Sequence, residues 1–258
     1  MTEDERQRHA SSFGAAATAY AAHRPDYALA AVNWALEHAP GPRVLDLGAG
    51  TGKLTATLVE LGADVVAVEP DAQMLAQLRG ELPAVRSLPG GAEAIPLPDA
   101  SVDAVLAGNA MHWFDMAVAG SEIARVLAPG GILAGLWNVM DDRVGWVAGL
   151  ERVSGSAAIG PRDTLSSWRA ATVELHLPKT GLARFDSPEQ DEFAHGQTRT
   201  AESLVATLAT RAGMLVMPEE DRDALLNRIR IFLASTPATV RGEFTLPMLT
   251  GVLRVRRR

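Results

Sequence analysis

The sequence predicts an α/β protein built on a doubly wound, mainly parallel β-sheet. Four short apolar runs, at 43–47, 64–68, 102–107 and 132–137, alternate with segments of helical periodicity. A turn with three glycines follows the first run, at 48–52. Strands that alternate with helices of about ten residues are typical of βαβ units, which form parallel sheets.

The remaining elements are predicted between and around these runs. Asp71 opens a helix that runs to about residue 79, and a weak strand is expected at 85–88. Before the sheet, helices are expected over residues 3–22 and from Asp26, as N-cap, to His38. After residue 140 the alternation fades. The segments expected there are a partly helical insertion at 141–180, a strand at 182–195, helices at 200–212 and 218–234, and a final strand at 243–255.

Composition limits the classes of protein. The 258 residues contain no cysteine, so disulfides and thiolate metal sites are excluded. The first ten residues lack an apolar signal segment, and the run at 130–140 is shorter than the ~18 residues of a membrane span. A net charge of −7 disfavours nucleic acid. Arg254 and Arg256 to Arg258 are interpreted as a solvated tail. We expect a cytoplasmic monomer or homodimer without nucleic-acid or membrane partners.

The glycine turn indicates a ligand site, because ligands bind at the carboxyl ends of strands in open α/β sheets. A phosphate-binding P-loop would require a glycine at Leu47 and a hydroxyl residue at Leu54. A dinucleotide fold would require Gly-x-Gly-x-x-Gly, but the third glycine, Gly52, comes one residue early. A tight turn without a ligand is the remaining alternative.

The segment 44–55 resembles motif I of class I S-adenosylmethionine (SAM)-dependent methyltransferases, whose usual form is acidic-x-Gly-x-Gly-x-Gly. This likeness implies a seven-stranded, Rossmann-like sheet and SAM as cofactor, with S-adenosylhomocysteine as product. Glu69 ends the next strand, where a carboxylate can accept hydrogen bonds from both ribose hydroxyls. From these two strands the cofactor-binding residues expected are Asp46, Gly48, Ala49, Gly50, Glu69 and Pro70.

Three further segments resemble the same family. Residues 91–98 look like the loop that holds the adenine, which implies cofactor contacts from Ala92 and Glu93. The stretches 20–27 and 109–115 resemble the small-molecule group of methyltransferase type 11 that includes trans-aconitate methyltransferases, which implies contacts from Tyr20, Arg24, Asn109 and Ala110. In this comparison Tyr20 and Arg24 face the α-carboxylate of the cofactor, which a guanidinium can bind bidentately.

The chemistry requires few protein groups, because methyl transfer from a sulfonium mainly needs alignment of the acceptor. His112 has three open roles: general base, positioning group or hydrogen-bonded wall residue. Trp113, Trp137 and Trp146 are expected with His112 in the substrate pocket, although core packing is the competing explanation for the aromatic residues. The spacing of the six histidines predicts no metal site.

The predicted function is SAM-dependent methylation of a small molecule at a carboxylate, hydroxyl or amine. The alternatives are a SAM-binding protein without transfer activity and a nicotinamide-dependent oxidoreductase. The predicted organisation is a single domain: a helical lid over residues 1–40, a SAM-binding core over 41–140, and insertion helices with strands that complete the sheet over 141–258.

Overall fold

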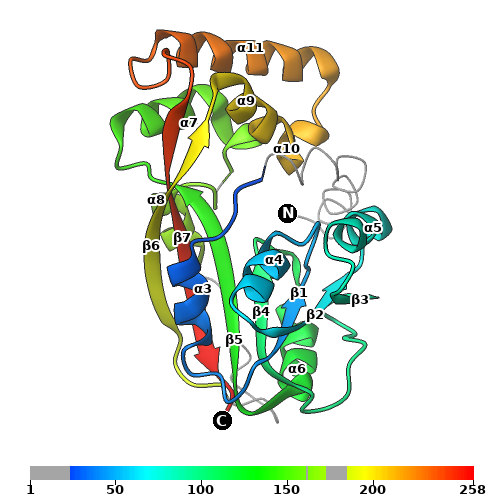
Figure 1. Cartoon of the computed structure of the whole chain (residues 1–258). Helices are drawn as coiled ribbons and strands as arrows, with labels where there is room; N and C mark the ends of the chain where they lie inside the picture. Colours follow the sequence, from blue (N-terminus) through cyan, green and yellow to red (C-terminus); the bar gives the residue numbers. More distant parts are fainter. Residues whose placement is uncertain (1–23, 161, 173–184) are drawn as a thin grey trace. The chain divides into compact units, whose positions relative to one another are not determined.

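A computed structural model describes residues 24–160, 162–172 and 185–258 (Figure 1). The predicted helix at 3–22 lies outside these residues, so the helical lid stays a prediction. The strands are β1 (Arg43–Leu47), β2 (Asp64–Glu69), β3 (Arg86–Pro89), β4 (Val102–Gly108), β5 (Leu127–Met140), β6 (Glu189–Arg199) and β7 (Phe244–Arg256). The helices are α3 (Leu29–Leu36), α4 (Lys53–Glu60), α5 (Ala72–Glu81), η2 (Met111–Trp113), α6 (Met116–Val126), α7 (Gly145–Ala158), α8 (Leu165–Thr172), α9 (Ala201–Ala209), α10 (Ala212–Leu215) and α11 (Glu219–Ser235).

The strands form one seven-stranded sheet in the order β3-β2-β1-β4-β5-β7-β6. The pairings from β3 through β5 are parallel. β7 runs antiparallel to β5, because Arg257 donates its backbone N–H to Gly131 whereas Asp141 donates to Pro247. The predicted doubly wound, mainly parallel sheet is therefore confirmed. The strand order reverses between β1 and β4, which is where ligands bind in folds of this class.

The chain divides into two compact units, which are described separately. Among the described residues, the sheet unit comprises 26–137, 185–193 and 250–258, and the helical unit comprises 24–25, 138–160, 162–172 and 194–249. The long strands β5, β6 and β7 each begin in one unit and end in the other.

Both faces of the central strands are buried in the sheet unit. Val44 on β1 packs with α3 and α4 in one apolar cluster. Leu45 and Leu47 point to the opposite face of the same strand and are equally buried. Because successive side chains of a strand point to opposite faces, both faces must be covered. α5 contacts β2 and β3, and its first turn is capped by Asp71, whose carboxylate accepts hydrogen bonds from the N–H groups of Gln73 and Met74.

The predicted N-cap of the helix before the sheet is wrong. α3 begins at Leu29, and Asp26 instead forms an ion pair with Lys53 at 3.0 Å. The N–H of Ala28, the residue at the N-cap, is bound by the hydroxyl of Thr250 at 3.1 Å. A partner more than two hundred residues away replaces the local cap, so no local pattern could have predicted it.

The C-terminal arginines do not form a uniform solvated tail either. Arg254 lies within β7, and its side chain is 7% exposed. Its guanidinium stacks on the ring of Trp34 at 3.7 Å and forms an ion pair with Glu189 at 2.7 Å. Arg254 therefore joins α3, β6 and β7 through a cation–π contact and a charge pair.

The helical unit has its own apolar core, formed mainly by α7, α9 and α11. α7 and α11 approach closely at Gly149, where a Cβ atom would lie 2.9 Å from the ring of Phe232. None of the helices in the described part of the chain combines the length and apolarity needed to cross a membrane.

Candidate cofactor site

The glycine turn joins β1 to α4 and has a backbone that only glycine adopts easily. Gly48 and Gly50 have φ angles of +71° and +56°. A Cβ atom at Gly48 would lie 2.8 Å from the Cβ of Ala110, so this position is closed by the chain that follows β4. A Cβ atom at Gly50 would meet no atom of the described residues within 4 Å. The turn is therefore packed on the protein at Gly48, whereas the described residues leave the Cβ position of Gly50 unobstructed.

Glu69 supports this turn from the end of β2. Its carboxylate accepts hydrogen bonds from the N–H groups of Gly50, at 2.8 Å, and Asp71, at 2.9 Å. The side chain is buried, and burial raises the pKa of Glu69 although both N–H groups act in the opposite direction. Each carboxylate oxygen can accept more than one hydrogen bond, so Glu69 can brace the loop and still bind ribose hydroxyls. Pro70, which was also predicted to contact the cofactor, lies between Glu69 and Asp71 in the chain.

Asp46 is fully buried beneath the turn, on the face of β1 that α4 covers. Its Oδ2 accepts a hydrogen bond from the hydroxyl of Thr55 at 2.6 Å. Its Oδ1 is also buried and has no hydrogen-bond partner within the described residues. Burial raises the pKa of Asp46 to about 7, and the charge of Glu69 acts in the same direction. Thr55 was not predicted as a functional residue. Its place in the first turn of α4, directly after the glycine turn, is the signal that could have found it.

The chain after β4 closes the turn from the other side. Asn109 has a φ of +51°, and its N–H donates to the carbonyl of Leu136 at 2.7 Å. Its side-chain amide donates to the hydroxyl of Tyr27 at 3.2 Å. Tyr27 is buried, and its hydroxyl occupies the space that a Cβ at Gly108 would fill. Tyr27 was missed as a site residue; the signal was that it is one of only two tyrosines in the chain.

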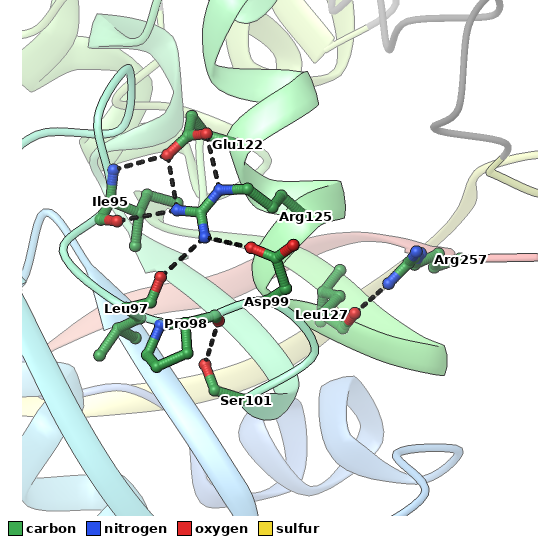
Figure 2. Close-up of polar contacts among 9 residues, drawn as sticks. All are labelled: Ile95, Leu97, Pro98, Asp99, Ser101, Glu122, Arg125, Leu127 and Arg257. Atoms are coloured by element: carbon green, nitrogen blue, oxygen red, sulfur yellow. Dashed lines mark hydrogen bonds and ion pairs between the residues drawn. The ribbon is translucent and has the colours of Figure 1, made fainter.

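Arg125 holds the part of the loop from Ile95 to Asp99, which follows Ala92 and Glu93 in the chain (Figure 2). Arg125 on α6 donates to the carbonyl oxygens of Ile95, at 2.9 Å, and Leu97, at 2.8 Å. It also forms ion pairs with Glu122 and Asp99, both at 2.8 Å, and Glu122 accepts the N–H of Ile95. One guanidinium thereby satisfies two backbone carbonyls of an irregular loop, which otherwise has few backbone partners.

The residues of this loop that were predicted to contact the cofactor have different surroundings. Ala92 is buried, and the Glu93 carboxylate accepts the N–H of Asp115 at 2.8 Å. This bond ties the loop to the N-terminus of α6, where Asp115 is the N-cap.

His112 and Trp113 lie in η2, directly after the residues that close the glycine turn. Both are half-buried, and their rings are in tilted contact with 4.9 Å between centroids. Trp137 on β5 is 1% exposed, and its indole N–H donates to His112 Nδ1 at 3.2 Å. The structure thus brings His112, Trp113 and Trp137 together in the sheet unit.

Three predicted residues are not among the described residues of the sheet unit. Tyr20 is outside the described residues. Arg24 belongs to the helical unit, where its buried guanidinium donates to the carbonyl of Thr210 at 3.2 Å. Trp146 belongs to the same unit and packs edge-on against Phe244, with 5.7 Å between ring centroids. The roles predicted for these three residues stay predictions.

Residues 45–135 match the model of the methyltransferase domain family. An uncharacterized methyltransferase of Mycobacterium tuberculosis is 42% identical over 244 residues, which cover 94% of each chain. An uncharacterized methyltransferase-like protein of Schizosaccharomyces pombe is 32% identical over 79% of this chain and 78% of its own. A solved structure described as a type II methyltransferase, from Anaeromyxobacter dehalogenans, is similar with a TM-score of 0.65 and 27% identity over 91% of this chain and 97% of its own.

The sheet order, the glycine turn and the acidic residue at the end of β2 define a class I methyltransferase fold. With the relatives above, they show that the chain belongs to the SAM-dependent methyltransferase family, as the sequence motifs predicted.

Proposed function

We propose that this protein binds SAM at the glycine turn and transfers its methyl group to a small-molecule acceptor. The observation that carries the proposal is the glycine turn at Gly50, which no described residue obstructs, beside a carboxylate that is buried and already oriented by two backbone N–H groups. An oriented carboxylate at the end of β2 suits two neighbouring hydroxyl groups, as in a ribose.

The charge of Glu69 beside the turn supports SAM over a phosphate-rich cofactor. Glu69 is buried there, and its negative charge raises the free energy of placing a further anion at the turn. NAD and ATP carry phosphates, whereas SAM carries a positively charged sulfonium. Bound SAM supplies an electrophilic methyl group, so the protein needs mainly to orient the acceptor and exclude water.

The residues that would hold the cofactor lie at or just after the ends of four neighbouring strands of the sheet unit, β1 to β4. Glu69 would bind the ribose, Ala92 and Glu93 would lie beside the adenine, and the backbone from Gly48 to Gly50 would face the amino-acid part. Asn109 and Ala110 would border it from the end of β4. A small acceptor is favoured because the net charge of −7 opposes nucleic acid.

Two experiments test this proposal. Isothermal titration with SAM and S-adenosylhomocysteine should show saturable binding, whereas NAD and ATP should show none. Incubation of the enzyme with methyl-labelled SAM and a metabolite extract should then label a small molecule. Binding without a labelled product would support a SAM-binding protein that lacks transfer activity, and absence of SAM binding would refute the proposal.

A further inference from the structure

Trp137 and His112 form a hydrogen bond with a defined direction. The indole nitrogen carries a hydrogen and has no lone pair to accept one, so it can only donate. The acceptor is Nδ1 of His112, at 3.2 Å. This nitrogen is therefore unprotonated, and in the neutral imidazole the ring hydrogen is on Nε2.

The sequence of β5 creates the space for this arrangement. Gly135 lies two residues before Trp137, on the same face of the strand. A Cβ atom at Gly135 would lie 2.4 Å and 2.7 Å from two carbons of the indole ring, so any larger residue would displace the ring. The side chain of Met111 approaches the same point, at 3.1 Å, and belongs to the helical turn that carries His112. Gly135 and Met111 together hold the indole against η2.

We propose that Trp137 is a positioning residue that fixes His112 as the Nε2–H tautomer, so that His112 meets the methyl acceptor as a hydrogen-bond donor and not as a general base. This inference rests on the proposed function for the identity of the bound molecule. In this tautomer Nε2 has a hydrogen in the ring plane, and the lone pair of Nδ1 is engaged by Trp137. An oxygen of the acceptor molecule is the group that such a donor binds and orients.

The tautomer can be measured without any ligand. In ¹⁵N NMR spectra of the full-length protein, a ring nitrogen with a hydrogen and one without differ clearly in chemical shift. The signals of His112 are assigned by their loss in His112→Gln, because the chain has six histidines. We expect an unprotonated Nδ1 and a protonated Nε2 in the wild type at pH 8, and a mixture of tautomers in Trp137→Phe, which keeps an aromatic ring but is smaller and lacks the N–H.

Trp168→Phe is the matched control, since Trp168 is also 1% exposed but lies on α8 in the helical unit. Its spectrum should show His112 as in the wild type. A protonated Nδ1 in the wild type, or the same His112 shifts in Trp137→Phe as in the wild type, would overturn the proposal. If Trp137→Phe unfolds, the wild-type shifts alone still decide the tautomer.

Kinetics separate the donor role from a base. The side-chain nitrogen of Gln can occupy nearly the position of Nε2 and donate, but it cannot accept a proton. Activity in His112→Gln within about tenfold of the wild type, with a loss of about a hundredfold in His112→Ala, is the expected result. Equal losses in both variants would overturn the donor role. SAM affinity should be unchanged in all of these variants, so a failure of SAM to bind the wild type would count against the proposed function and not against the tautomer.

Discussion

The carboxyl group of Asp46 makes the stability of this enzyme depend on pH in an unusual direction. Its pKa is raised from 3.8 to about 7 by burial. Because the pKa is higher in the folded than in the unfolded state, the folded protein is favoured while this group is protonated. The contribution is complete below about pH 4 and is lost as the pH rises through 7.

The size of the effect follows from the two pKa values. Each tenfold difference in proton affinity corresponds to about 1.4 kcal/mol, so full ionisation of Asp46 costs roughly 4 kcal/mol. Between pH 5 and pH 8 the loss is roughly 2.5 kcal/mol, because part of it has already occurred at pH 5. Asp46→Asn removes this dependence. Its amide can still accept from Thr55, but its N–H₂ group would be buried at the position of Oδ1, which costs about 1–3 kcal/mol at every pH.

Urea unfolding of the wild type and Asp46→Asn at several pH values measures the difference. The free energy of unfolding of the variant relative to the wild type should rise by roughly 2.5 kcal/mol from pH 5 to pH 8. Asp103→Asn is the control, since the hydrogen bond from Arg43 lowers the pKa of Asp103. Asp103 is ionised in both states above pH 5, so its variant should be destabilised equally at each pH. A flat difference for Asp46→Asn would refute the assigned burial of its charge.

Three further predictions concern the same unit. Glu69→Ala should lower SAM affinity at least tenfold by titration calorimetry. It should also lower the unfolding free energy by about 1–3 kcal/mol, because two N–H groups lose their acceptor. Glu60→Ala, at an exposed position, is the control and should change neither quantity. Gly48→Ala should destabilise the fold by about 2–4 kcal/mol through backbone strain and a clash, whereas Gly50→Ala should cost only the strain of about 1–2 kcal/mol and act chiefly on SAM affinity. Arg125→Leu should destabilise by about 2–4 kcal/mol and expose the loop at 91–101 to limited proteolysis, and equal cleavage of variant and wild type would contradict its role.

The sheet and its ligand-binding edge could be predicted because their signals are local. Short β-branched runs, the glycine turn and the acidic residue after the second strand each lie within a few residues of the element that they define. The strand that begins at Leu127 shows the limit of this approach. The predicted run at 132–137 is only the middle of β5, whose register against β4 shifts between Val102, opposite Leu127, and Ala104, opposite Ile132.

The candidate functional side chains could be located from the sequence, but their hydrogen-bond and ion-pair partners could not. Asp46 and Glu69 were expected to contact the cofactor, yet the local pattern did not show that Glu69 braces the turn or that Asp46 is fully buried. Arg254 was misinterpreted for the same reason, since its partners Trp34 and Glu189 are distant in sequence.

The same argument applies to His112, whose chemical role depends on a residue 25 positions away. A histidine after the fourth strand is equally compatible with a base, a donor or a wall residue while it is considered alone. The indole N–H of Trp137 removes one of these possibilities, because a nitrogen that accepts a hydrogen bond from a permanent donor is not the nitrogen that carries the proton. Gly135 then explains why the indole can lie there at all. The proposed donor role of His112 therefore depends on three residues, one in η2 and two within β5, of which only the histidine has a reactive side chain.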